Sequence, residues 1–262
     1  KDSGKEFSPS PAPFLPIFIW PFQIFALFPP RISFWLWTIL NLAALILYLR
    51  FFTKEIAPHR KTKRLLILLL LSYPVYLNLY WGQINIWLVI CVGESMRAAQ
   101  RGKGLYSGLW LGGLLLKPQT LILVIPVLIF KRAWKTLGSF VFASGILLVS
   151  SIVLAGLSGL GNLARLWLGY AAGLPTSAPE IMMNWRMIGL NLGAFTNSTI
   201  GWSIAIPGML ITAGGWLLLL LKPFPISSPK IAILYLGTLA ATNVITWHSH
   251  LHMLMLMLPL LI

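Results

Sequence analysis

Long apolar segments separated by short polar or basic segments dominate the pattern of this 262-residue chain. Residues 33–52, 137–157 and 202–221 each contain close to the ~20 apolar residues that a helix needs to cross ~30 Å of hydrocarbon. No segment shows the alternating pattern of transmembrane strands, so helices are the expected spanning elements. The sequence therefore predicts an all-α, polytopic membrane protein of about eight transmembrane helices, in a single transmembrane domain over residues 1–262.

Prolines are expected to bend the first apolar segment and the one over residues 65–80. Pro16 and Pro21 fall in the first one, and proline lacks the N–H group that a helix interior needs. We therefore expect residues 1–32 to form an external leader followed by a bent interfacial or re-entrant segment. Pro74 is expected to kink the helix over residues 65–80.

Lys117 lies between two apolar segments that are too short to span. Residues 104–116 and 121–130 would measure about 20 and 15 Å as helices, less than the hydrocarbon thickness. Lys117 is therefore expected below the outer surface, in a cavity. An intramembrane lysine is a functional hypothesis by default, with a lipid phosphate as its natural partner; the alternative is that the side chain snorkels to the headgroups.

Composition supports the membrane assignment and charge orients the chain. Hydrophobic residues make up 58% of the sequence, charged residues 10%, and the formal net charge is +15. Most of the bases fall in four short loops, which the positive-inside rule places in the cytoplasm, so the charge reports topology and not nucleic-acid binding. The four groups are Arg50, Lys54, Arg60, Lys61, Lys63 and Arg64; Arg97, Arg101 and Lys103; Lys131, Arg132 and Lys135; and Lys222 and Lys230.

This orientation places four polar features on the same outer face. They are the amide turn of residues 82–85, Lys117, the histidine-containing residues 246–252, and residues 158–200, which are rich in Gly, Pro, Ser and Asn. We expect residues 158–200 to form an external loop with a short amphipathic piece at residues 163–170. The orientation rests on the loop charges alone, so the convergence indicates one extracytoplasmic site in a multi-pass membrane protein.

Amide and aromatic side chains in these segments are candidates to line the site. Gln83 and Asn85 lie between two apolar runs. An unpaired amide in lipid costs several kcal/mol, so both must face protein, water or a polar ligand. The predicted cavity-lining residues are Gln83, Asn85, Gln119, Asn184, Trp247 and His252.

His248, His250 and His252 alternate with other residues near the end of the chain. Only His248 and His252, at i and i+4, would share one face of a helix. Three interpretations remain open. The histidines are interfacial side chains hydrogen-bonded to neighbours, or they bind a phosphate or move a proton, for which a pKa of about 6.5 is suited. Zinc binding is the third, but the sequence supplies no further ligand nearby, and we expect no metal.

Carboxylates are scarce on the predicted outer face, where acid–base catalysis would need one. Asp2 and Glu6 lie in the polar leader and Glu180 in the long loop, and none belongs to a recognisable motif. The sequence also lacks the motifs of phosphate-binding loops, serine nucleophile elbows and cysteine-pair metal sites. Cys91, the single cysteine, lies in an apolar segment, so we expect a buried thiol and no internal disulfide.

Several motifs occur in an order that resembles one family. They are residues 7–37, which begin Phe-x-Pro-x-Pro; the amide turn 82–85; residues 108–118, ending in Leu-Lys-Pro; the basic-aromatic residues 131–134; Asn184-Trp185-Arg186; and Trp247-His248-Ser249-His250. This ordered set, which extends over nearly the whole chain, resembles glycosyltransferase family 87, the polyprenyl-phosphate-mannose-dependent α-mannosyltransferases and their relatives.

The resemblance implies a membrane-embedded glycosyltransferase of the GT-C type that needs no cofactor and no metal. A sugar, expected to be mannose, would pass from a polyprenyl-phosphate donor to a hydroxyl of a glycan or glycolipid acceptor on the extracytoplasmic face, with inversion at the anomeric carbon. Lys117 and Arg186 would bind the donor phosphate, and His248 or His250 would assist catalysis. We expect the protein to lie among the lipids of a bacterial plasma membrane.

The chain departs from the family pattern at its start. The family's catalytic aspartate belongs to the first external loop, and this sequence is expected to begin downstream of that loop. We therefore expect a longer parent chain with its base upstream of Lys1. Two other classes remain open, namely a transporter, which also places polar groups at helix breaks, and a non-catalytic subunit of a membrane complex, which needs no base.

Overall fold

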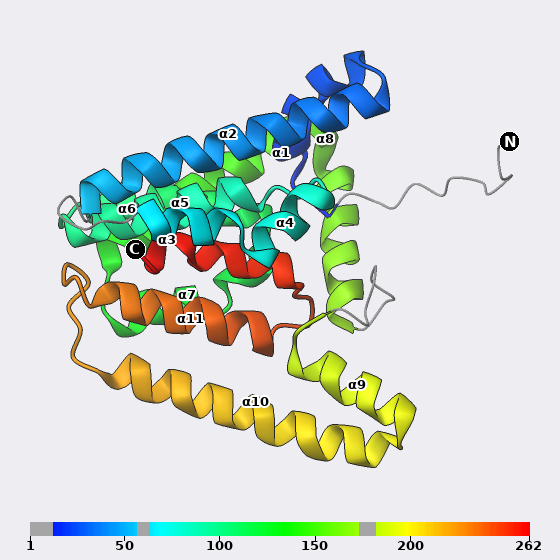
Figure 1. Ribbon diagram of the computed structural model, residues 1–262, viewed down its shortest axis with the longest axis vertical. Helices are drawn as coiled ribbons and strands as arrows, with labels where there is room; N and C mark the ends of the chain where they lie inside the picture. The colour runs from blue at the N-terminus through cyan, green and yellow to red at the C-terminus, as the bar shows by residue number, and fades with distance from the viewer. Residues whose placement is uncertain (1–12, 57–62, 173–181) are drawn as a thin grey trace, which may run out of the picture.

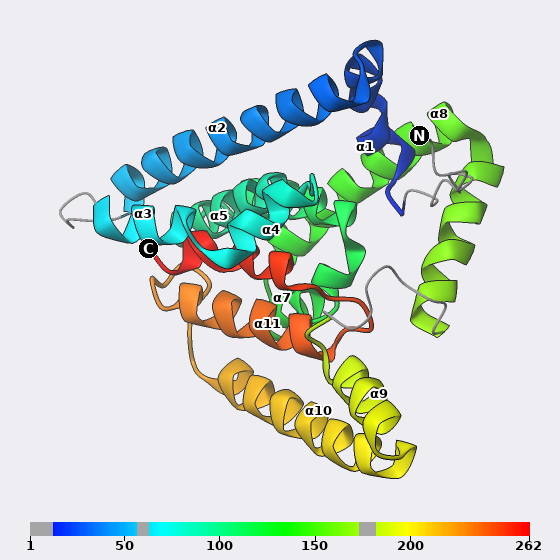
Figure 2. The same ribbon diagram turned by 45° about the vertical axis from the view of Figure 1, so that its right-hand side comes forward.

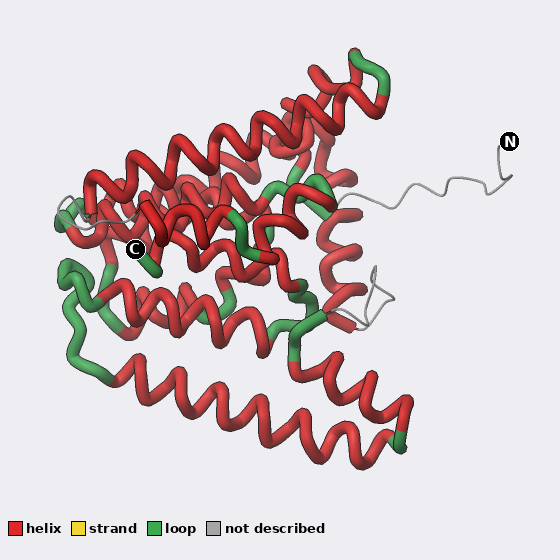
Figure 3. Tube along the Cα trace, viewed as in Figure 1, coloured by secondary structure: helices red, strands yellow, loops and turns green. Residues whose placement is uncertain are grey.

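The computed structural model describes residues 13–56, 63–172 and 182–262. These residues form helices and turns, and their one β-type pairing is an isolated bridge between Met182 and His250, so Figure 3 shows helices and loops throughout the described chain. The elements are α1 (Pro16–Ile19), η1 (Trp20–Leu27), α2 (Pro30–Ile56), α3 (Lys63–Leu70), α4 (Tyr73–Tyr80), α5 (Asn85–Gln100), α6 (Gly104–Gly112), η2 (Gly113–Leu116), η3 (Pro118–Leu121), α7 (Val124–Phe130), α8 (Trp134–Ala172), α9 (Trp185–Phe195), α10 (Ser198–Leu221), α11 (Ile231–Ile245) and η5 (Leu251–Leu260).

Three of the described helices are long and apolar enough to cross a membrane. They are α2, α10 and the part of α8 from Trp134 to Gly169. The other apolar helical segments have 10–17 residues, because breaks divide them. The predicted all-α, polytopic membrane fold is confirmed.

Two breaks follow the sequence prediction. The helix expected over residues 65–80 divides into α3 and α4, with Pro74 in the first turn of α4, where the absence of a proline N–H costs nothing. This confirms the predicted kink. A second break at Lys117 separates η2 from η3.

The described residues of the basic clusters lie together at one end of the bundle, called here the basic end. Arg101 at the end of α5 is paired with Glu55 at the end of α2, and Lys131 Nζ after α7 donates to the carbonyl of Lys222 after α10 at 2.5 Å. In Figure 1, α2 and α10 both end at the left and α11 begins there. The loops grouped by charge in the sequence are therefore also grouped in space.

The opposite end carries residues 82–85, 117–119 and 246–252 and is called here the amide end. Asn85 contacts His252 there, and Met182 pairs with His250. Helix α5 connects the two ends, since its 16 residues rise about 24 Å. It lies at the centre of the bundle, where it contacts α2, α6, α11 and η5.

Helix α8 changes direction at Gly156, whose φ of 70° interrupts its helical backbone. Glycine adopts this left-handed region without the steric penalty of a Cβ atom. Figure 2 shows the part of α8 beyond the bend running across one end of the bundle, whereas α2 and α10 run along it. The bend therefore separates a spanning part of α8 from a part that crosses the amide end.

The prediction of an external loop over residues 158–200 is wrong for most of the described residues, although the amphipathic piece expected at residues 163–170 does lie in a helix. Residues 158–172 are helical as the second part of α8, and residues 185–195 form α9; residues 173–181 lie outside the described residues. The many glycines hid a helical pattern, because Leu160, Leu163 and Trp167 follow the i, i+3, i+7 spacing of one helix face.

Candidate functional site

The amide turn is held by side-chain hydrogen bonds from α4. Asn78 Nδ2 donates to the Gln83 carbonyl at 3.2 Å, and Asn78 Oδ1 accepts from the Asn85 N–H at 3.3 Å. Asn78 is fully buried, so both polar groups of its amide are used inside the protein. Gly82 has a φ of 59° and allows the sharp reversal between α4 and α5. The turn therefore has a defined backbone conformation, which fixes the positions from which the side chains of Gln83 and Asn85 extend.

Lys117 reaches this turn from the break between η2 and η3. Its side chain is buried at 8% exposure, and its Nζ donates to Gln83 Oε1 at 3.0 Å and lies 3.5 Å from Met253 Sδ. No carboxylate of the described residues forms an ion pair with it. The ammonium points into the protein, which argues against snorkelling to the headgroups.

Burying an ammonium without an opposite charge is costly, because one amide oxygen and a thioether replace only part of its hydration. The break between η2 and η3 allows the Lys117 side chain to take this position. Residues on both sides of Lys117 satisfy their own backbone, for example through the Thr120 N–H bond to the Lys117 carbonyl at 2.9 Å. The fold therefore holds a cation in a place that suits a bound anion.

The histidine segment lies next to this lysine. The His248 and His250 rings are 5.0 Å apart between centroids, and those of His250 and His252 are 5.4 Å apart and stacked. Asn85 Nδ2 donates to the His252 carbonyl at 3.3 Å, which attaches the segment to the amide turn. The structure thus joins three regions that are far apart in sequence, around Gln83, Lys117 and His252.

Burial, together with the nearby His250 and the positive charge of Lys117, lowers the pKa of His248 to about 4. His248 is therefore neutral near pH 7, with one ring nitrogen as a donor and the other as an acceptor. A neutral imidazole can donate to a phosphate oxygen or exchange a proton, but it adds no standing charge. Within the described ranges no group of three His, Cys, Asp or Glu residues could hold a metal ion.

The segment before α9 pairs with the histidine segment. Besides the bridge between Met182 and His250, the Met183 N–H donates to the Ser249 carbonyl at 3.0 Å. Asn184 is fully buried and its Oδ1 accepts from the Met187 N–H at 2.8 Å. Asn184 is therefore the N-cap of α9, a structural role that the sequence analysis did not identify.

Arg186, Gln119 and Trp247 are less tightly connected to this cluster. Each is half-buried, and none has a side-chain hydrogen bond or ion pair with another described residue. Arg186 lies near the start of α9, two residues after Asn184, and is joined to the histidine segment only through the backbone. Its role in phosphate binding stays a prediction.

Two residues of the site escaped the sequence analysis. Asn78 is an amide within an apolar helix, a signal that the sequence did contain. Trp37 of α2 donates its indole N–H to the Gly82 carbonyl at 2.9 Å, and the sequence analysis included it only in residues 7–37 of the family resemblance. A contact across 45 residues leaves no trace in the local pattern.

The described carboxylates lie far from this site. Glu94 and Glu55 belong to the basic end, where they pair with Arg97 and Arg101. Glu94 is nine residues along α5 from Asn85, about 13.5 Å of helix rise. Asp2, Glu6 and Glu180 lie outside the described residues.

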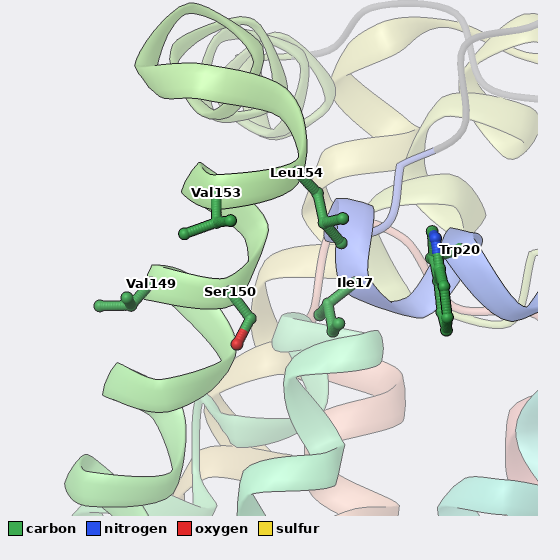
Figure 4. Close-up of a pocket in the computed structure, with 6 residues that line it drawn as sticks. All are labelled: Ile17, Trp20, Val149, Ser150, Val153 and Leu154. Carbon is green, nitrogen blue, oxygen red and sulfur yellow. The ribbon is translucent and has the colours of Figure 1, made fainter.

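A shallow apolar groove of about 310 Å³ lies between α1, η1 and α8. Figure 4 shows its lining side chains, among which Ser150 supplies the one hydroxyl. None of the predicted site residues lines this groove. It lacks the charges and amides that a sugar phosphate would need, so the candidate site remains the cluster at the amide end.

Comparison with known proteins gives one match. The family described as Glycosyltransferase family 87 matches residues 14–256, which include every element of the amide end. No curated protein and no solved structure matches the chain. The family match extends over most of the sequence, together with the apolar helices of a membrane protein. The chain belongs to glycosyltransferase family 87, a family of membrane glycosyltransferases.

Proposed function

We propose that this glycosyltransferase takes mannose from a polyprenyl-phosphate donor and passes it to a hydroxyl of a glycan or glycolipid. The observation that carries the proposal is the buried ammonium of Lys117, whose described partners are one amide oxygen and one thioether. A phosphate oxygen in contact with Nζ would supply the missing opposite charge.

The same ammonium would act during the reaction. When the bond between the anomeric carbon and the phosphate oxygen breaks, the phosphate keeps the electron pair and gains negative charge. A preorganised cation stabilises that developing charge more than it stabilises the intact donor, and this difference lowers the barrier. The acceptor oxygen would attack from the opposite side of the sugar ring, with inversion at the anomeric carbon.

His248 and His250 would assist as neutral donors. The depressed pKa of His248 favours an imidazole that donates one N–H to the phosphate or to the acceptor hydroxyl. The acceptor proton needs a base, and a carboxylate is the usual group. Glu55 and Glu94 are both engaged in ion pairs at the basic end, so we do not assign the base to either.

A lipid-linked donor fits the position of the site. The positive-inside rule supports a cytoplasmic basic end and an extracytoplasmic amide end. Nucleotide sugars are cytoplasmic substrates, whereas a lipid-linked phosphate can present its sugar at the outer membrane surface. Arg186 near the start of α9 is the second cation that we assign to the donor phosphate.

The test is a transfer assay with the full chain in lipid nanodiscs, using polyprenyl-phosphate [14C]mannose and a membrane glycolipid extract as acceptor. We expect labelled product from the lipid-linked donor and none from GDP-[14C]mannose. Replacing Lys117 by Met should suppress transfer, whereas Lys103→Met at the basic end should not. Transfer from the nucleotide sugar, or equal activity in Lys117→Met, would overturn the proposal.

A further inference from the structure

Trp37 borders the site and contacts the backbone of the amide turn. It lies on α2, and its indole N–H donates to the Gly82 carbonyl at 2.9 Å. Gly82 is the turn residue with the positive φ, so its carbonyl direction depends on an otherwise costly backbone conformation. The hydrogen bond therefore holds Gly82, the residue of the turn with the least common backbone conformation.

A continuous series of contacts leads from this indole to the buried ammonium. Trp37 holds the carbonyl of Gly82, the next residue is Gln83, and Gln83 Oε1 accepts from Lys117 Nζ at 3.0 Å. The geometry points to Trp37 as a positioning residue, which acts through the turn and Gln83 to place the ammonium of Lys117. This inference rests on the proposed function for its effect on sugar transfer.

The indole is itself held in place by aromatic neighbours. Phe22 and Phe25 of η1 pack against it, with ring centroids at 4.7 and 5.7 Å. Packing of this kind fixes the ring plane and with it the direction of the N–H group. The segment before α2 thus contributes to the amide end without reaching the site.

Trp35 provides a matched contrast on the same helix. It lies two residues earlier, is 62% exposed and contacts Phe34 edge to face. Within the described part of the chain its indole makes no hydrogen bond. Trp35 has the features of a membrane-belt tryptophan, which anchors a helix at the interface, whereas the N–H of Trp37 is used inside the protein.

The central experiment compares Trp37→Phe with Trp35→Phe in the nanodisc transfer assay. Both changes keep an aromatic ring, and only the first removes a hydrogen bond of this site. We expect Trp37→Phe to raise the KM for the lipid-linked donor about three- to tenfold, the usual worth of one hydrogen bond. The kcat should fall as well, because the same ammonium stabilises the charge that develops on the phosphate. The response to acceptor concentration should change less, and Trp35→Phe should leave the donor KM and kcat unchanged.

A double-mutant cycle separates positioning from general damage. In a Gln83→Leu background the path from Trp37 to Lys117 is already cut, so Trp37→Phe should add no further increase in donor KM. Equal effects of Trp37→Phe in the wild-type and Gln83→Leu backgrounds would overturn the inference, because the indole would then act by another route.

A second measurement does not depend on activity. Lys117 is buried at 8% exposure, so its labelling by a membrane-permeant amine reagent reports how firmly the ammonium is held. Trp37→Phe should increase the labelling of Lys117 relative to the exposed Lys103 several-fold, whereas Trp35→Phe should not. Unchanged labelling together with an unchanged donor KM would refute the role of Trp37. If wild-type protein shows no transfer, the proposed function fails, and the labelling result alone still decides the role of Trp37.

Discussion

Buried charged side chains have charged partners at the basic end of the bundle and neutral described partners at the amide end. At the basic end, Arg97 Nε donates to both oxygens of Glu94 at 3.1 and 2.9 Å, and Tyr48 donates to the same carboxylate at 3.2 Å. Arg97 also lies over the Phe51 ring, 5.3 Å from its centroid. At the amide end, Lys117 is more deeply buried and has only neutral described partners.

This difference indicates different roles. A charge that is matched by a hydrogen-bonded partner serves packing, since here it ties α5 to α2, and little is gained by adding a ligand. A buried charge that is not matched costs stability in the free protein, and binding of an anion recovers that cost. The contrast therefore indicates a structural role for the basic end and supports the proposed anion binding at the amide end.

The sharpest way to break this contrast is to remove the cation at the amide end. Replacing Lys117 by Met keeps a flexible chain of similar length and removes the charge. We expect kcat/KM for the lipid-linked donor to fall about 100-fold, as for the loss of a charged hydrogen bond. The thermal midpoint should stay constant or rise, because an unmatched buried charge is lost.

Lys103→Met is the control for this prediction, because Lys103 is an exposed cation at the basic end. Its activity should equal that of the wild type. A drop of the thermal midpoint in Lys117→Met by several degrees, with activity retained, would show that the lysine has a structural role and would remove the contrast.

Much of the architecture could be predicted because membrane insertion leaves strong signals in sequence. The length of the apolar segments predicted the helical membrane fold, and the loop charges predicted that the basic clusters lie on one side. Pro74 predicted the division between α3 and α4. The short segments around Lys117 predicted its burial. In each case the physical cause acts on consecutive residues and is therefore visible in a local window.

The contacts of the site could not be predicted in the same way. The bond from Trp37 to Gly82, the stacking of His250 on His252 and the cap formed by Asn184 depend on how distant helices pack. The helix over residues 158–172 was predicted only in part, as an amphipathic piece at residues 163–170, for another reason. Its glycines favour a loop by composition, although contacts such as the bond from Trp167 Nε1 to the Pro13 carbonyl at 2.9 Å help to hold it in place.

Removing a partner at the basic end should have the converse effect. Glu94→Gln leaves Arg97 without its two-point contact, and Glu94 is buried, so we expect the free energy of unfolding to fall by about 2 kcal/mol. The donor KM should not change. Denaturant unfolding monitored by circular dichroism and the transfer assay together check this.

Glu55→Gln provides the comparison within the same cluster. The Glu55 side chain is 36% exposed, and exposed ion pairs contribute little, so its loss should have a smaller effect on unfolding than Glu94→Gln. A larger loss in Glu55→Gln, or a changed donor KM in either variant, would argue that the basic end does more than hold α2 against α5.

The histidine segment tests whether the amide end acts beyond its one cation. Replacing His248 and His250 together by Gln keeps side chains that can donate hydrogen bonds but removes the titratable rings. We expect kcat to fall about tenfold, the loss of one catalytic hydrogen bond or proton transfer, with less change in donor KM. Unchanged turnover in single-turnover measurements would return these histidines to a purely structural role.

The smallest expected effect is a pH dependence of stability that belongs to the amide end alone. Burial holds the pKa of His248 at about 4, below its ordinary value of 6.5. Between these values the unfolded chain binds a proton that the folded chain excludes, so stability is present above pH 6.5 and declines as the pH falls toward 4. His248→Gln should therefore lose less thermal stability than the wild type between pH 7 and pH 5 in the same detergent. If both proteins lose the same amount, His248 is not held neutral by its surroundings, and the contrast between the two ends would rest on Lys117 only.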